Sequence, residues 1–336
     1  MRKNEAGIRK EHETIRNAVG YYDFTHQLLE VTGKDAKAFL DYIFVSSIAK
    51  AKVGEAKYTT MLNEDGVIID DVIVFRIDDE LYWVSTLYIS DMIRWFDAHK
   101  EKMDVSYKDI TPVTTMYAVQ GPKSGAVLND FLKEKIDDMK LFTIKDNMID
   151  NVPVKIARSG YTGELGYEIY CKPDDKALVE SKLEDYGFKH GISKIATDVI
   201  ITSLPREKGY VLMSDLAGTN PLEVGFDWTV SWDKKFLGKA ALEIVKTHGP
   251  KHALLGFTVD DDAAVIEPKE QVMINGEVVG NVTTFTYGYT IEKNIGFALI
   301  ENAKAKVGDR VTIGKYTAIL TDRIFYDVDN ARVRNK

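Results

Sequence analysis

Two adjacent carboxylates in an apolar run are the first candidates for chemistry in this sequence. Asp70 and Asp71 lie within residues 67–75, VIIDDVIVF, which are typical of a buried β-strand. Because side chains alternate across a strand, we expect Asp71 to share a face with Ile69 and Ile73, and Asp70 to point to the other face. An unpaired buried carboxylate is costly and has a raised pKa, so a functional role would explain both. The structural alternative is that both accept backbone hydrogen bonds or pair with a lysine at a strand end.

A second segment combines glycines with tyrosines and acids. Residues 158–170 read RSGYTGELGYEIY, with a glycine at every third position from 160 to 166. Glycines at this spacing allow the backbone to turn tightly or to approach a flat ligand. Tyr161 could stack on an aromatic ring, and Glu168 could accept two hydrogen bonds from an amidine-like edge such as that of a pterin. By spacing alone, a hairpin with a solvated glutamate is the better interpretation.

Several other kinds of site are absent from the sequence. It contains no GxxxxGK[ST] phosphate loop, no GxGxxG after a strand, and neither an HExxH nor a GxSxG motif. A net charge of −8 without a Lys/Arg-rich block argues against a nucleic-acid partner. Cys171 is the single cysteine, which excludes an intramolecular disulfide and a cysteine-based zinc site. We therefore predict no metal site.

Neither an export signal nor a membrane span is expected. The first 24 residues are charged and helical in pattern, without the apolar core of a signal peptide. The most apolar run, residues 66–75, is short and contains two aspartates. With 45% hydrophobic and 29% charged residues, the composition is that of a globular protein. We predict a soluble protein of the reducing cytoplasm.

These candidate residues must be positioned by a mixed set of helices and strands. A length of 336 residues predicts two or three domains. Hydrophobic periodicity predicts helices at 5–18, 34–44, 122–132, 176–186 and 236–247. Strand-like runs and turn residues predict extended segments at 21–31, 150–157 and 160–171 and an antiparallel meander over 57–84. From about His252 onward, only short strands and turns are expected. The prediction is an α+β protein with a C-terminal β-domain.

The two candidate segments match the paired signatures of one family. MLNEDGVIIDDVIVFRI and RSGYTGELGYEIY are similar to NExGGIxDDxIV and RTGYTGExGxEI of the glycine cleavage T-protein family, in the same order and at a similar separation. Further similar stretches are DFTHQLLEVTGKDAKAFLD near the start, AVQGPKS at 118–124, and residues 220–242 and 280–300. The sequence therefore resembles this family over nearly its whole length.

The resemblance implies a three-domain fold around a central folate site. Two interleaved α+β domains are expected, one from 1–29 and 113–209, the other from 30–112 and 210–248, beside a C-terminal antiparallel β-domain at 249–336. Tetrahydrofolate is the implied cofactor.

The family match also implies roles for individual residues. Asp71 falls at the position of the catalytic carboxylate near N5 of the pterin, where it can orient the folate and stabilise positive charge. Tyr58 and Tyr161 fall at pterin-contact positions, and Glu168 at the position that hydrogen-bonds the amino-pyrimidine edge. Trp228 aligns with a tryptophan near the same site. Asp70 is then the packed neighbour of the catalytic residue.

Three features depart from the family pattern. The chain starts almost directly at the helix that follows the family's PFAGWxMP-like stretch. The arginine of the ARDxLRLEAG segment, which meets the folate-tail carboxylate, aligns with Ile201, and Arg206 is the displaced candidate for that contact. The asparagine at a strand end of the family is Thr86 in this sequence. These departures leave the folate-tail contacts open.

A retained acceptor site with altered surroundings favours a change of one-carbon donor. We therefore predict a tetrahydrofolate-dependent demethylase that moves a methyl group from a small O-, S- or N-methyl compound to N5. The alternative is the aminomethyltransferase of the glycine cleavage system, whose partner is an aminomethyl-lipoyl carrier protein. A non-enzyme alternative is a folate-binding iron–sulfur assembly factor, but its KGCYxGQ signature is replaced by DKKFLG at 233–238.

Overall fold

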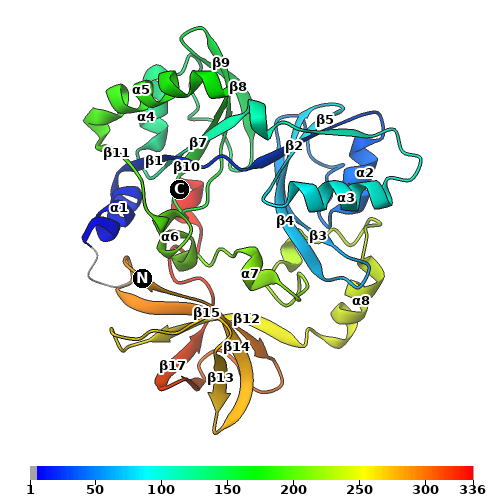
Figure 1. The fold of residues 1–336 in the computed structure, drawn as a ribbon, viewed down its shortest axis with the longest axis vertical. Coiled ribbons are helices and arrows are strands. Elements are labelled where there is room, and N and C mark those ends of the chain that lie inside the picture. Colours follow the sequence, from blue (N-terminus) through cyan, green and yellow to red (C-terminus); the bar gives the residue numbers. More distant parts are fainter. Residues whose placement is uncertain (1–5, 336) are drawn as a thin grey trace.

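A six-stranded sheet forms the first of three β-structures in the computed structural model, which describes residues 6–335 (Figure 1). In spatial order its strands are β11 (Ile192–Lys194), β1 (Val19–Asp23), β7 (Thr115–Gln120), β10 (Gly166–Cys171), β9 (Val152–Ala157) and β8 (Ile144–Ile149). β1 and β11 run parallel, and the other neighbours are antiparallel. Every residue of β7 and β10 is buried, because both faces of these central strands are covered.

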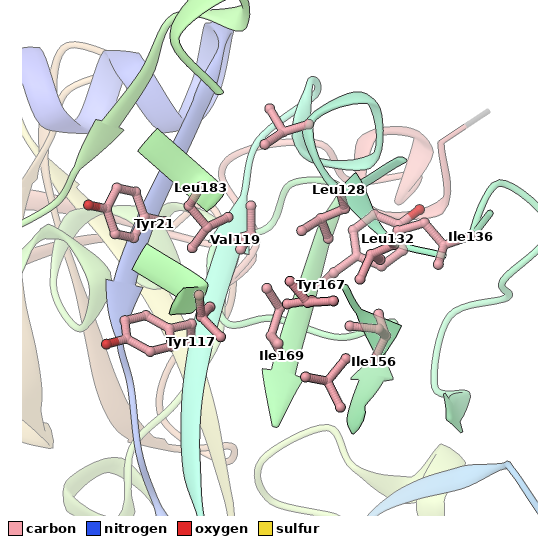
Figure 2. Packing of buried hydrophobic residues seen from close by; sticks show 14 of the residues in the cluster. Tyr21, Tyr117, Val119, Leu128, Leu132, Ile136, Ile156, Tyr167, Ile169 and Leu183 are labelled. Atoms are coloured by element: carbon pink, nitrogen blue, oxygen red, sulfur yellow. The ribbon is translucent and has the colours of Figure 1, made fainter. Parts of the chain in front are cut away.

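Helices cover the outer face of this sheet. They are α4 (Ser124–Phe131) and α5 (Lys176–Gly187), while α1 (Ala6–Asn17) packs beside β1. Figure 2 shows how Tyr117, Val119 and Ile169 from the strands pack with Leu128 and Leu183 from the helices. The opposite face of the sheet carries the alternate residues of the same strands and points to the second sheet.

The second sheet has five antiparallel strands. In spatial order they are β3 (Ala56–Leu62), β4 (Ile68–Asp78), β5 (Leu81–Thr86), β2 (Gln27–Thr32) and β6 (Ser106–Asp109). Helices α2 (Ala36–Ile43) and α3 (Ile89–His99) cover one face. Residues of the other face join Tyr22, Ala118 and Tyr170 of the six-stranded sheet in one hydrophobic cluster. This shared core fixes the two sheets face to face.

The third β-structure is a closed antiparallel barrel. It contains β12 (His252–Val259), β15 (Lys293–Glu301), β14 (Glu277–Gly288), β13 (Gln271–Ile274), β16 (Arg310–Ile313) and β17 (Tyr316–Thr321). Four short helices connect or flank the sheets and barrel: α6 (Ser203–Glu207), α7 (Met213–Leu216), α8 (Lys239–His248) and α9 (Ala331–Arg334). The 3-10 turns are η1 (Thr111–Val113), η2 (Pro173–Asp175), η3 (Phe188–His190), η4 (Asp198–Ile200) and η5 (Asp227–Thr229). In Figure 1, α6 and α7 lie in the middle of the molecule, between the sheets and the barrel.

The α+β fold with a C-terminal antiparallel β-domain is confirmed, with three local corrections. The predicted strand at 21–31 is two strands in different sheets, because Asp23 accepts hydrogen bonds from the backbone N–H and hydroxyl of Thr25 and thereby stabilises a turn. Residues 160–165 form a turn before β10, with Gly163 in the left-handed region at φ +79°. The segment after the barrel ends in α9, where no helix was predicted. Residue 5 of the first predicted helix lies outside the described residues.

None of the helices within residues 6–335 combines the length and the apolar character needed to cross a lipid bilayer.

Candidate active site

Tyr58 on β3 is the centre of the candidate site. Its hydroxyl donates a hydrogen bond to Oδ2 of Asp71 over 2.9 Å. Its ring stacks on Trp228 of η5 with centroids 6.2 Å apart, and meets Phe226 edge-on at 5.5 Å. Because Trp228 is 66% exposed, this Tyr58–Trp228 stack connects the half-buried carboxylate of Asp71 to the protein surface.

The two adjacent aspartates have different surroundings. Asp70 is buried and accepts hydrogen bonds from the Thr86 hydroxyl at 2.6 Å and from the backbone N–H of Asp71 at 2.9 Å. Asp71 keeps partial exposure and faces Tyr58. Burial raises the pKa of Asp70 to about 7, although the Thr86 hydrogen bond opposes this shift. Burial likewise raises the pKa of Asp71 to about 6, against the Tyr58 hydrogen bond.

The predicted alternation of side chains holds along most of β4. Val72 and Val74 pack with the helix-covered core, whereas Ile73 and Phe75 pack in the shared core between the sheets. Ile69 was predicted on the face of Ile73, and this was wrong, since it packs against the cluster of Val72. The cause is a bulge in the pairing of β3 with β4, which inserts one residue and changes the faces before Asp70.

Tyr161 lies in the turn at 160–165 and packs against the segment that follows α6. Its hydroxyl donates to the carbonyl oxygen of Val211, and its ring stacks on Tyr210 at 5.6 Å. Burial raises the pKa of Tyr161, and the charges of Arg206 and Asp71 also act on it. The turn therefore brings Tyr161 into the electrostatic environment of Asp71, although one ring face is used by Tyr210.

Glu168 occupies a second buried position, on the inner face of β10. Burial raises the pKa of its carboxyl, while a hydrogen bond from Tyr170 opposes the shift. The Tyr170 hydroxyl donates over 3.0 Å, and the Tyr170 ring contacts Phe75 of β4 at 6.0 Å. The buried hydroxyl of Tyr22, which lies close enough for Glu168 to raise its pKa, has no hydrogen-bond partner within residues 6–335. Glu168 thus lies between the two sheets with an unsatisfied hydroxyl beside it.

Arg206, the displaced candidate for the folate tail, is buried and paired. Its Nη1 donates to Asp215 Oδ2 and to the Tyr210 carbonyl, both at 2.8 Å. Asp215 also accepts hydrogen bonds from Thr283 and Thr284 of β14 at 2.7 Å each. This bridge ties α6 and α7 to the barrel, so Arg206 has a structural role, and its contact with folate stays a prediction.

The positions of the two other departures are also defined. Ile201, at the position of the family's arginine, follows η4 and is 38% exposed. Thr86 ends β5, and its hydroxyl links Asp70 to the backbone N–H of Tyr88. The remodelled positions therefore include one apolar surface residue and one partner of the buried aspartate.

Arg323 is the site residue that sequence reasoning missed. It lies just after β17, and its Nη1 donates to the Val224 carbonyl at 2.6 Å. Its guanidinium carbon lies 5.5 Å from the centroid of the Phe226 ring. A single arginine in the stretch TDRIF has no pattern that marks it, because its neighbours in the site are about a hundred or more residues away in the chain.

Comparisons with known proteins bear on this arrangement. The model of the GCVT N-terminal domain matches residues 2–234, and that of the glycine cleavage T-protein C-terminal barrel domain matches residues 252–327. The aminomethyltransferase of Clostridium botulinum (strain Kyoto / Type A2) is 33% identical over 331 residues, which covers 95% of this chain and 89% of that protein. The aminomethyltransferase of Bacillus cereus (strain G9842) is 32% identical over 319 residues, covering 92% and 86%.

A solved structure shows the same fold. The crystal structure of glycine cleavage system aminomethyltransferase T from Bartonella henselae matches with a TM-score of 0.84 at 24% identity, covering 98% of this chain and 91% of that one. Fold and matched domains together define a folate-dependent transferase. The chain belongs to the glycine cleavage T-protein family, as the sequence predicted, and its cofactor is tetrahydrofolate.

Proposed function

We propose that this enzyme is an aminomethyltransferase, which takes its one-carbon unit from an aminomethyl-lipoyl carrier protein and passes it to tetrahydrofolate. The observation that supports this proposal is the likeness to curated aminomethyltransferases over 95% and 92% of the chain. The demethylase that the sequence departures favoured becomes the second candidate.

The side chains of the candidate site fit tetrahydrofolate. Glu168 is a buried acceptor beside the unsatisfied hydroxyl of Tyr22, a combination that suits the amino-pyrimidine edge of a pterin. Asp71 lies on β4, the strand of Phe75, and Phe75 contacts Tyr170, which donates a hydrogen bond to Glu168. The two carboxylates therefore lie on strands of the two facing sheets, where both can contact one bound pterin.

Asp71 is the proposed catalytic carboxylate. When bound, tetrahydrofolate supplies N5 as the nucleophile that accepts the one-carbon unit. With a pKa of about 6, Asp71 is largely ionised at neutral pH and can stabilise positive charge near its carboxylate. The hydrogen bond from Tyr58 holds Asp71 in one orientation, and the exposed Trp228 provides an aromatic surface at the edge of the site.

One observation favours the demethylase as a second candidate. At the position of the family's folate-tail arginine, this chain has the exposed apolar side chain of Ile201. Such a substitution in the lining of the site is compatible with a different one-carbon donor. In that reaction the donor would be a small O-, S- or N-methyl compound.

The two candidates differ in their products. The enzyme is incubated with tetrahydrofolate and either an aminomethylated lipoyl carrier or a panel of methoxy-aromatic, methylthio and methylamine compounds. We expect methylene-tetrahydrofolate and ammonia from the carrier. Methyl-tetrahydrofolate from the panel, together with no reaction of the carrier, would reverse the assignment. The Asp71→Asn variant serves in both reactions as the control for turnover at this site.

A further inference from the structure

Arg323 is a half-buried cation without an ion pair. Among residues 6–335 its guanidinium forms no salt bridge, and its Nε is buried without a hydrogen-bond partner. Burial lowers the pKa of Arg323, although arginine remains charged at neutral pH. A guanidinium donor that is shielded from water without an acceptor is destabilising, so its presence calls for a ligand that is part of function.

The other buried arginines of the centre do have their partners. Arg206 is paired with Asp215, and Arg16 with Glu164 and Glu207. Arg158 has no carboxylate, but its two terminal nitrogens donate to backbone carbonyls, and none of its nitrogens is left buried without a partner. Arg323 therefore differs from these arginines in having a guanidinium N–H donor without an acceptor.

Arg323 lies beside the candidate active site. Its guanidinium carbon lies 5.5 Å from the centroid of the Phe226 ring, and Phe226 contacts Tyr58, which hydrogen-bonds Asp71. Asp215 is already bonded to Arg206. Within residues 6–335, Arg323 therefore has no carboxylate as an ion-pair partner of its own.

We propose that Arg323 binds the glutamate carboxylate of the tetrahydrofolate tail, and so supplies the hydrogen bonds that the apolar side chain of Ile201 cannot donate. This inference rests on the proposed function. A guanidinium presents a fork of donors that matches a carboxylate. Of the two substrates, tetrahydrofolate carries carboxylates, whereas an aminomethyl-lipoyl amide carries none. The tail would then pass along Phe226, next to which the guanidinium lies, and along Trp228, which contacts Phe226 edge-on.

Calorimetry without any donor tests this contact. Two ligands are compared: tetrahydrofolate, and a methyltetrahydropterin that lacks the aminobenzoyl-glutamate tail. We expect Arg323→Gln to weaken tetrahydrofolate binding roughly 10- to 100-fold and to leave tetrahydropterin binding unchanged. Arg323→Lys keeps the charge without the fork and should lie between wild type and Arg323→Gln. Melting temperatures show that each variant is folded.

Arg206→Gln is the matched comparison, because it removes the neighbouring arginine that is already paired. It should lower the melting temperature through Asp215 without changing the ratio of the two affinities. Two results would overturn this inference and leave the proposed function standing. One is an equal affinity of wild type and Arg323→Gln for tetrahydrofolate. The other is a loss of affinity that appears only in Arg206→Gln and only for the ligand with the tail. A wild-type protein that does not bind tetrahydrofolate would contradict the proposed function itself.

Discussion

Two regions in the centre of this molecule bury charge in opposite ways. The first is the interdomain cluster, formed by Arg16, Glu164, Glu207, His12 and Arg332. Arg16 bonds Glu207 at 2.9 Å and Glu164 at 3.3 Å, and Arg332 bonds Glu164 at 2.9 Å. These contacts join α1, α6, the turn at 160–165 and the C-terminal segment. Each charge of the cluster has a partner of opposite sign.

The second region is the candidate site around Tyr58. Here Asp71 and Arg323 are buried or half-buried, yet neither has an ion-pair partner within residues 6–335. The difference appears in the pKa values. Burial alone would raise the pKa of Glu207, but His12 and Arg16 lower it to about 2, whereas burial raises that of Asp71 to about 6. Paired charges serve stability, and charges left unpaired mark the place where a ligand is expected.

The largest expected effect is a loss of stability in the interdomain cluster. Glu207→Gln removes the charge of the closer of the two carboxylates that pair with the buried Arg16, which should lower the free energy of unfolding by roughly 3 kcal/mol. Urea denaturation measures this loss. Glu13→Gln is the control, because Glu13 forms an exposed pair with Arg9 at 3.4 Å and should change stability by less than about 0.5 kcal/mol. Similar losses in both variants would show that the cluster is no more stabilising than a surface pair.

The next effect is a loss of turnover at Asp71. Asp71→Asn keeps the shape of the side chain and removes its charge, so we expect turnover to fall on the order of 100- to 1000-fold without a loss of stability. In the wild type, activity should rise with pH through about 6 as Asp71 ionises. Steady-state rates from pH 5 to 8 for both proteins measure these effects. A variant that keeps the wild-type rate would remove Asp71 from the proposed mechanism.

The sequence predicted the architecture better than the individual contacts of the site. Alternation in β4 placed Asp70 and Asp71 on opposite faces, because the strand period is a local property. Ile69 was misplaced by a bulge whose position depends on pairing with β3. The sequence could not show that Arg206 is paired and that Arg323 is not. Tertiary packing brings Asp215 to Arg206 and leaves the Nε of Arg323 without an acceptor. Motifs thus identified the class of site, and packing decides which charges are free within it.

The smallest expected effect separates Asp70 from Asp71. Asp70 is 2% exposed, and burial raises its pKa from an ordinary 3.8 to about 7. Between these two values the folded protein holds a proton that the unfolded chain releases. The contribution of Asp70 to stability is therefore fully present below about pH 4 and is lost as the pH rises towards 7.

Asp70→Asn removes this titration and keeps an acceptor for the backbone N–H of Asp71. Relative to wild type, the variant should gain on the order of 1 kcal/mol of stability between pH 5 and pH 8, because only the wild type acquires a buried charge over this range. Its turnover should stay within a few fold of wild type, since Thr86 and not the Tyr58–Trp228 stack contacts Asp70. Urea denaturation at the two pH values, with rates at pH 8, tests both statements. The contradicting result would be a loss of turnover in Asp70→Asn equal to that in Asp71→Asn, without any pH-dependent change in stability. The two carboxylates would then act together in catalysis, and Asp70 would not have a separate role in stability.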